Sequence, residues 1–305
     1  MPIPWLFRSK RRRRPAALVL GGGGARGLAH VGVLHVLEEL DRRPDLIVGS
    51  SIGAVIGAMY AQDPDIHRLR RRLEEFLDSS FFASVGLDAF RRQHENGLFP
   101  LIDEWIQGIR MRLSATRALT HEGMIPARVL REGLEMLLED GDVSACRIPY
   151  VCVAVDLLSG ETRLLRDGGI REAVAASCSI PGVIAPAVID GRPLVDGAVT
   201  SATPVLEART AGARTVVVVD VSKDLSDHTA PKVGFEIMQR AGDIAAARCN
   251  RTHLEHADHI LRPAVHKYHW ARFDLAAQFI ETGIECARSH ENSLRSVFSH
   301  PERKP

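Results

Sequence analysis

The chain has 305 residues, 45% of them hydrophobic and 25% charged, which is enough to bury a large core and excludes a disordered or fibrous protein. Its formal net charge is +1, and its five cysteines are odd in number, scattered and without a C-x-x-C pair. They indicate neither a disulfide framework nor a thiolate zinc site, and they fit a reducing, cytoplasmic location.

The first predicted feature is a basic arm over residues 1–14. Residues 5–14 run from Trp5 to Arg14 and combine apolar groups with six basic side chains, which leaves an acidic excess in the rest of the chain. This composition suits peripheral contact with an anionic membrane, at the inner membrane surface, and equally suits a solubilising tail. No second basic cluster follows, so nucleic-acid binding is not expected.

From residue 15 onwards, short apolar runs alternate with amphipathic stretches, the pattern of a mostly parallel sheet covered by helices. The run 16–20 is too short for a signal-peptide core or a membrane span, and it predicts a strand. Further strands are expected at residues 46–48, 150–155 and 162–165, near Val188 and Leu194, and at 215–220. Helices are expected at residues 28–40, 52–60, 126–138, 170–176, 204–210, 233–248 and 273–298.

Residues 79–120 interrupt this alternation with scattered aromatic side chains in an arginine-rich stretch. We interpret them as an insertion over the sheet, with a lid as one use for it. The chain shows no internal repeat and no linker long enough to separate two domains. Residues 15–305 are therefore expected to form one domain.

A glycine-rich loop, Gly21-Gly22-Gly23-Gly24-Ala25-Arg26-Gly27, separates the first strand from the first helix. It satisfies G-x-G-x-x-G, but no acidic residue ends the second strand as a dinucleotide site requires, and no Lys-Ser or Lys-Thr follows as in a Walker loop. Unobstructed backbone N–H groups at a helix start can bind an oxyanion as readily as a phosphate. Both ligands remain open at this point.

The sequence Gly49-Ser50-Ser51-Ile52-Gly53 is a G-x-S-x-G motif between a predicted strand and a predicted helix. Glycines on both sides of a serine allow the sharp turn of a nucleophile elbow, which presents the hydroxyl above the end of the strand. The positive end of the following helix faces charge that develops nearby. Ser51 is therefore the candidate nucleophile.

The positions of the histidines argue against a histidine as the base that would activate Ser51. His30 and His35 lie on the first predicted helix, and the i,i+3 series His253, His256 and His259 is expected as an exposed helical stripe that leads to a strand. Asp196, at a strand end before Gly197, offers a carboxylate instead. A strand-end Asp-Gly pair is also a common turn former, so the residues alone leave both roles open.

Three segments, in this order, resemble the signatures of patatin-like phospholipases: residues 22–27 (Gly-Gly-Gly-Ala-Arg-Gly), 49–53 (Gly-Ser-Ser-Ile-Gly) and 196–198 (Asp-Gly-Ala). Residues 153–160 and 176–182 are similar to internal blocks of that family. The resemblance covers about residues 16–220. It implies a three-layer α/β/α sandwich with a mostly parallel central sheet, and cleavage of lipid acyl esters of the phospholipase A, lysophospholipase or esterase type.

The resemblance also implies a Ser–Asp dyad without histidine, metal or cofactor. Its implied site residues are Ser51 as nucleophile, Asp196 as base, the backbone of Gly22, Gly23 and Gly24 as oxyanion hole, and Arg26, Gly49, Gly53 and Gly197 in support. Two positions depart from the family pattern: residues 184–186 read Ile-Ala-Pro where Pro-Pro is frequent, and Ala202 stands where an Asn is usual. We expect the first to reshape the acyl pocket and the second to loosen the turn that holds Asp196.

A different class of function also fits the glycine loop. In this alternative the protein is a non-catalytic module that binds a phosphate or a dinucleotide and is recruited to membranes by its basic arm. The sequence indicates no particular headgroup, acyl chain or oligomeric state.

Overall fold

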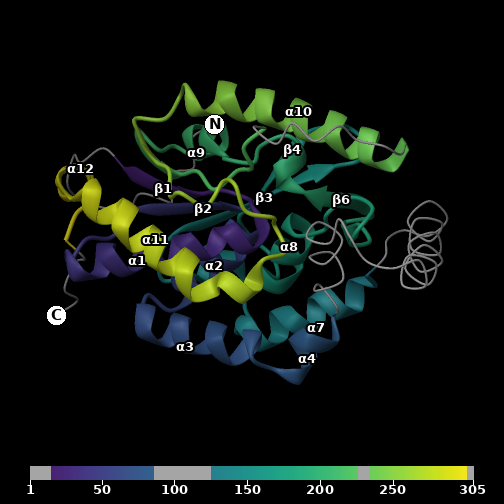
Figure 1. Cartoon of the computed structure of the whole chain (residues 1–305), viewed down its shortest axis with the longest axis horizontal. Helices are drawn as coiled ribbons and strands as arrows, with labels where there is room; N and C mark the ends of the chain where they lie inside the picture. The colour runs from purple at the N-terminus through teal and green to yellow at the C-terminus, as the bar shows by residue number, and fades with distance from the viewer. Residues whose placement is uncertain (1–14, 86–124, 226–233, 301–305) are drawn as a thin grey trace, which may run out of the picture.

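Within the residues that the structure describes, eight strands form one sheet in the order β5-β6-β3-β2-β1-β7-β8, with β4 paired to β3. The structure is a computed structural model that describes residues 15–85, 125–225 and 234–300 (Figure 1). The strands are β1 (Ala16–Leu20), β2 (Leu46–Ser50), β3 (Tyr150–Asp156), β4 (Thr162–Leu165), β5 (Ala187–Ile189), β6 (Arg192–Asp196), β7 (Thr215–Val219) and β8 (His259–Leu261).

The centre of the sheet is parallel, and its β5 edge is antiparallel. The parallel pairs are β1 with β2 and β7, β2 with β3, and β7 with β8. Strands β4 and β6 run antiparallel to β3, and β5 runs antiparallel to β6. The predicted mostly parallel sheet is thus confirmed.

Two apolar cores lie on opposite faces of the sheet, because successive side chains of a strand point to opposite sides. Leu18 and Leu20 belong to the larger core, whereas Ala17 and Val19 belong to the smaller one. The larger core is covered by α1 (Ala29–Glu39), α2 (Ile52–Gln62), α3 (Ile66–Leu77), α7 (Ala127–Leu137), α8 (Ile170–Ser177), α11 (Ala276–Ser289) and α12 (Glu291–Val297). The smaller core is covered by α9 (Val205–Thr210) and the end of α10 (Gly234–Leu254). The fold therefore has the three expected layers (Figure 1).

Several helices differ from the sequence predictions. The sequence analysis did not predict α3, although Ile66, Leu69 and Leu73 are buried along one face and Asp65 caps its first turn through the Arg68 amide. It also missed the short α4 (Ser80–Ser84). The helix expected at 233–248 continues to residue 254, and the one expected at 273–298 is divided into a 3-10 turn, α11 and α12.

The expected exposed helical stripe of histidines is wrong for two of its three members, whereas His256 is exposed and the strand expected after the series is β8. His253 lies on α10 with its side chain only 13% exposed, and its Nδ1 lies 3.0 Å from Ser201 Oγ. His259 is the first residue of β8 rather than part of a helix. The basic arm at residues 1–14 and most of the expected insertion at 79–120 lie outside the described residues.

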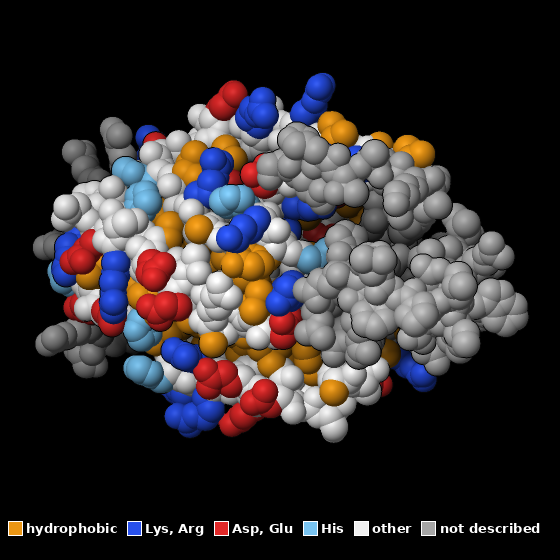
Figure 2. All heavy atoms as spheres, in the orientation of Figure 1, with side chains coloured by type: hydrophobic (Ala, Val, Ile, Leu, Met, Phe, Trp, Pro, Cys, Tyr) orange, Lys and Arg blue, Asp and Glu red, His pale blue; other side chains and the backbone are white. Residues whose placement is uncertain are grey.

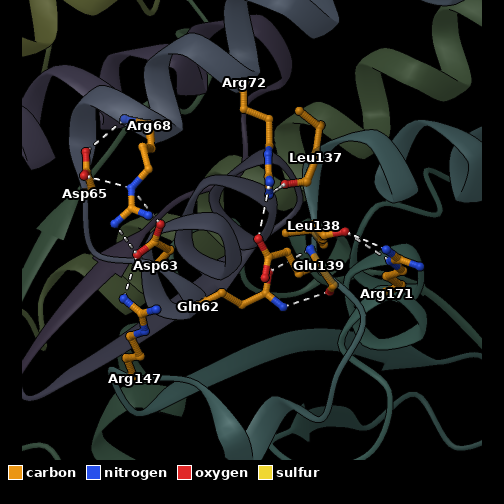
Figure 3. A network of polar contacts seen from close by, with 10 residues as sticks. All are labelled: Gln62, Asp63, Asp65, Arg68, Arg72, Leu137, Leu138, Glu139, Arg147 and Arg171. Atoms are coloured by element: carbon orange, nitrogen blue, oxygen red, sulfur yellow. Dashed lines mark hydrogen bonds and ion pairs between the residues drawn. The ribbon is translucent and has the colours of Figure 1, made fainter.

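A polar network joins several helices at the carboxyl end of α2, whose other end adjoins Ser51 (Figure 3). Asp63 accepts from Arg68 and Arg147, and Gln62 exchanges hydrogen bonds with the backbone of Glu139, two residues after α7. An 11-residue helix is about 16 Å long, so this network is remote from the site described next. Its ion pairs are solvent-exposed, and such pairs contribute about 0–1 kcal/mol each.

Candidate active site

Ser51 stands at the junction of β2 and α2 in a strained conformation. Its φ of 55° and ψ of −127° fall outside the regions that most residues adopt. The flanking glycines permit the turn, since a Cβ on Gly53 would lie 2.0 Å from the Leu20 carbonyl oxygen, and one on Gly49 would lie 2.5 Å from that of Gly53. The turn places Ser51 just beyond the carboxyl end of a parallel strand, as a nucleophile elbow does.

The hydroxyl of Ser51 meets the carboxylate of Asp196. Ser51 Oγ donates to Asp196 Oδ2 at 2.7 Å, and the Ala198 amide donates to Asp196 Oδ1 at 2.8 Å. Asp196 ends β6, where it pairs with Ala154 of β3, and its own amide donates to the Ser179 carbonyl at 2.9 Å. Both carboxylate oxygens are therefore engaged, and the side chain is held in one orientation.

Burial sets the basicity of this carboxylate. Asp196 is 4% exposed, and burial raises its pKa from the ordinary 3.8 to about 6, against the opposing effect of the hydrogen bonds from Ser51 and Ala198. At neutral pH the group is still mostly ionised. It is thus a stronger proton acceptor than an exposed aspartate while remaining in the form that can accept a proton.

Ser177, on the last turn of α8, fixes the backbone of the elbow. The Ser51 amide donates to Ser177 Oγ at 3.0 Å, and Ser177 Oγ donates to the Val153 carbonyl at 2.6 Å. The sequence analysis included Ser177 in a family block but gave it no role. Gly197 packs beside the same carbonyl, since a Cβ there would lie 2.4 Å from Val153 O.

The glycine loop lies directly against the serine. A Cβ on Gly22 would be 3.2 Å from Ser51 Cβ, and the Gly22 amide donates to the Ala202 carbonyl at 2.7 Å. In the part of the chain that the structure describes, no group accepts a hydrogen bond from the amides of Gly23 or Gly24. Gly24 has a φ of +58°, in the left-handed region that favours glycine. Of the three expected oxyanion donors, Gly22 is thus already engaged.

Two buried side chains brace this loop from behind. Arg26 is 5% exposed and donates from Nε to the Val221 carbonyl at 3.0 Å and from a terminal nitrogen to the Tyr268 carbonyl at 2.9 Å. His30 Nε2 lies 2.8 Å from the Gly21 carbonyl, and burial lowers the pKa of His30 to about 4, so the ring is neutral and donates there. Arg26 therefore lies where a bracing residue is expected, whereas the contact of His30 was not anticipated.

The loop is packed against backbone carbonyls rather than open along its length. A Cβ on Gly23 would lie 2.6 Å from the Val221 carbonyl oxygen, and one on Gly24 would lie 2.5 Å from that of Trp270. This close packing keeps both positions as glycine. Among the described residues, no group of three or more His, Cys, Asp or Glu side chains is placed to hold a metal ion.

Comparison of the sequence with known proteins shows the family to which the chain belongs. The sequence profile described as patatin-like phospholipase matches residues 18–209, a stretch that includes the glycine loop, Ser51 and Asp196. The chain belongs to the patatin-like phospholipase family. This patatin-like protein is 33% identical over 214 residues to mouse patatin-like phospholipase domain-containing protein 6, and 31% identical over 228 residues to an uncharacterized NTE family protein of Mycobacterium bovis.

These alignments cover most of this patatin-like chain but only part of its relatives. They include 69% and 74% of the chain, but 14% of the mouse protein and 54% of the mycobacterial one. The solved structure of VipD from Legionella pneumophila aligns with 92% of the chain and 67% of its own length, at 13% identity and a TM-score of 0.42, a likeness too distant to bear on the site.

Proposed function

We propose that this patatin-like protein is a serine hydrolase that cleaves acyl esters of lipids, as a phospholipase A, lysophospholipase or esterase. The observation that carries the proposal is the 2.7 Å hydrogen bond from Ser51 Oγ to a buried carboxylate, at a strained turn beside a glycine loop. Strained backbone of this kind is typical of functional sites. The family membership supports the same chemistry.

In the proposed mechanism, Asp196 accepts the hydroxyl proton while Ser51 Oγ attacks the ester carbonyl carbon. The carbonyl oxygen becomes an oxyanion, and the amides of Gly23 and Gly24 are the donors that we assign to it, because the Gly22 amide is engaged by Ala202. Collapse of the tetrahedral intermediate breaks the bond to the alcohol, which leaves with the proton from Asp196. Water then attacks the acyl-enzyme with Asp196 again as base, releases the fatty acid and restores Ser51.

We further propose that the protein is cytoplasmic and meets its substrate by peripheral contact with lipid surfaces. Several large apolar side chains are exposed: Leu157 and Leu158 follow β3, Val199 lies three residues after Asp196, and Ile237 and Met238 lie near the start of α10. Figure 2 shows hydrophobic side chains at the molecular edge that α10 occupies in Figure 1. Among the described residues, no helix is long and apolar enough to cross a membrane. The expected contact through residues 5–14 lies outside the described residues.

The test compares Ser51→Ala and Asp196→Asn with two exposed controls, Ser159→Ala and Asp190→Asn. Hydrolysis of p-nitrophenyl butyrate should fall at least about 10³-fold in the first pair and stay near wild type in the second. A fluorophosphonate probe should label Ser51 in the wild type, and a panel of phospholipids, lysophospholipids and triacylglycerols should identify the substrate class. Full activity in Ser51→Ala would remove Ser51 from the mechanism, whereas nucleotide binding without any labelling would favour the non-catalytic alternative.

A further inference from the structure

The segment that follows the proposed base is anchored to a distant helix. Thr203 lies seven residues after Asp196 and is fully buried. Its amide donates to Asn250 Oδ1 on α10 at 3.1 Å, and its hydroxyl donates to the same oxygen. Because a backbone N–H can only donate, the Oδ1 atom of Asn250, and not its Nδ2 atom, faces Thr203.

The other end of the Asn250 amide holds a second loop. Asn250 Nδ2 donates to Ser222 Oγ at 3.2 Å, in the loop that follows β7. Among the α10 side chains that the structure describes, Asn250 alone is buried, with 5% of its surface exposed. The buried side chain of this mostly exposed helix is thus an amide that bridges two loops.

Both loops touch the glycine loop at its reacting end. On one side, Ala202, next to Thr203, accepts the hydrogen bond from the Gly22 amide at 2.7 Å. On the other side, the Val221 backbone, next to Ser222, packs so closely on Gly23 that a Cβ there would lie 2.6 Å from its carbonyl oxygen. The Asn250 amide therefore ties together the two segments between which Gly22 and Gly23 are held.

We propose that Asn250 is a positioning residue that fixes the oxyanion loop through Ala202 and Val221, without contacting the substrate itself. This role rests on the proposed Ser–Asp mechanism. The amide offers an acceptor toward Thr203 and a donor toward Ser222 in one flat group. Asp keeps the acceptor toward Thr203 but can only accept from the Ser222 hydroxyl and adds a buried charge, and Leu, of similar size, loses both contacts.

The consequence is a loss of transition-state stabilisation rather than of substrate binding. Displacing a donor by about 1 Å costs on the order of 10²-fold in rate. For Asn250→Leu we expect kcat to fall about 10- to 100-fold with KM nearly unchanged, and Asn250→Asp to retain an intermediate kcat. The affinity for a trifluoromethyl ketone, which forms a tetrahedral adduct with the serine, should fall by the same factor as kcat.

The experiment measures kcat, KM and ketone affinity for wild type, both Asn250 variants and the exposed neighbour variant Arg251→Gln, which should match the wild type. The pH profile of kcat/KM should keep its midpoint, since Asp196 itself is not altered. Should Asn250→Leu not fold, Thr203→Val and Ser222→Ala, each of which removes one bond to the amide, are expected to show the same paired loss in kcat and ketone affinity.

A folded Asn250→Leu protein, or failing that both single-bond variants, with wild-type kcat and ketone affinity would overturn the positioning role while leaving the hydrolase intact. A lower unfolding temperature with unchanged kcat would likewise reduce Asn250 to a structural contact. If the wild type itself neither hydrolyses esters nor reacts with a fluorophosphonate, the proposed function fails, and this role fails with it.

Discussion

Replacing Asp196 by Asn tests whether the ionised carboxylate of the proposed dyad lowers the free energy of unfolding. Burial raises the pKa of Asp196 from 3.8 to about 6, so folding favours its protonated form. A group of this kind contributes its full stability below its unfolded pKa and loses that contribution as pH rises through its folded pKa. Since one pKa unit corresponds to about 1.4 kcal/mol, ionised Asp196 costs the folded protein about 3 kcal/mol at pH 8.

We therefore expect Asp196→Asn to be inactive but more stable than the wild type, by up to about 3 kcal/mol at pH 8. The advantage should shrink to roughly half at pH 5 and to roughly a fifth at pH 4, because the Asp196 carboxyl then becomes protonated in the unfolded wild-type chain as well. The measurement is the free energy of unfolding in urea at each pH. Asp190→Asn, an exposed change on the same hairpin, should shift it by less than about 0.5 kcal/mol.

Activity supplies an independent check on the same carboxyl. The base must be ionised to accept the proton, so kcat/KM of the wild type should fall about tenfold for each pH unit below a midpoint near 6. A stability difference between Asp196→Asn and wild type that stays constant from pH 4 to pH 8 would refute the reasoning. It would mean that Asp196 ionises in the folded protein as it does in the unfolded chain.

Three further changes test the supports of the site. Ser177→Ala leaves the buried Ser51 amide without its acceptor and should cost about 1–3 kcal/mol in chemical unfolding, with a lower kcat; an unchanged unfolding curve would contradict this. Gly24→Ala forces a Cβ to within 2.5 Å of the Trp270 carbonyl oxygen at a positive φ, so we expect less folded protein by circular dichroism and not a local loss of activity alone. Burial lowers the pKa of His30 from 6.5 to about 4, so His30 contributes stability above pH 6.5 that is lost as the pH falls toward 4. The free energy of unfolding of His30→Gln should therefore fall less between pH 7 and pH 4 than that of the wild type. The same pH dependence in both proteins would argue against a buried neutral ring.

Much of the fold could be predicted because its information is local. Buried strands such as β1 and β7 are nearly continuous apolar runs, and glycines follow the end of β1. The antiparallel edge is also visible in retrospect, since Asp190-Gly191 between two short strands is a hairpin turn. The sequence analysis named those two strands but did not assign their direction.

In the candidate site, too, the residues that could be predicted are those that stand in local sequence motifs. Ser51 and Asp196 stand in short motifs that mark a strand end and a turn, so the sequence could nominate them. Ser177 and Asn250 could not be nominated, because their contacts join residues 126 and 47 positions apart and no local pattern encodes such a distance. The expectation for Ala202 considered its side chain, whereas its carbonyl is what the glycine loop uses.

The placement of Ser51 and Asp196 on the sheet has a practical consequence for inactivation. The serine follows β2 and the aspartate ends β6, with only β3 between those two strands. Because the base that we propose is a carboxylate, reagents that modify imidazole rings are expected to leave turnover unaffected, in contrast to hydrolases whose base is a histidine. On heating, catalysis should persist until the backbone ladder itself melts, so that residual activity and far-ultraviolet ellipticity decline along one curve.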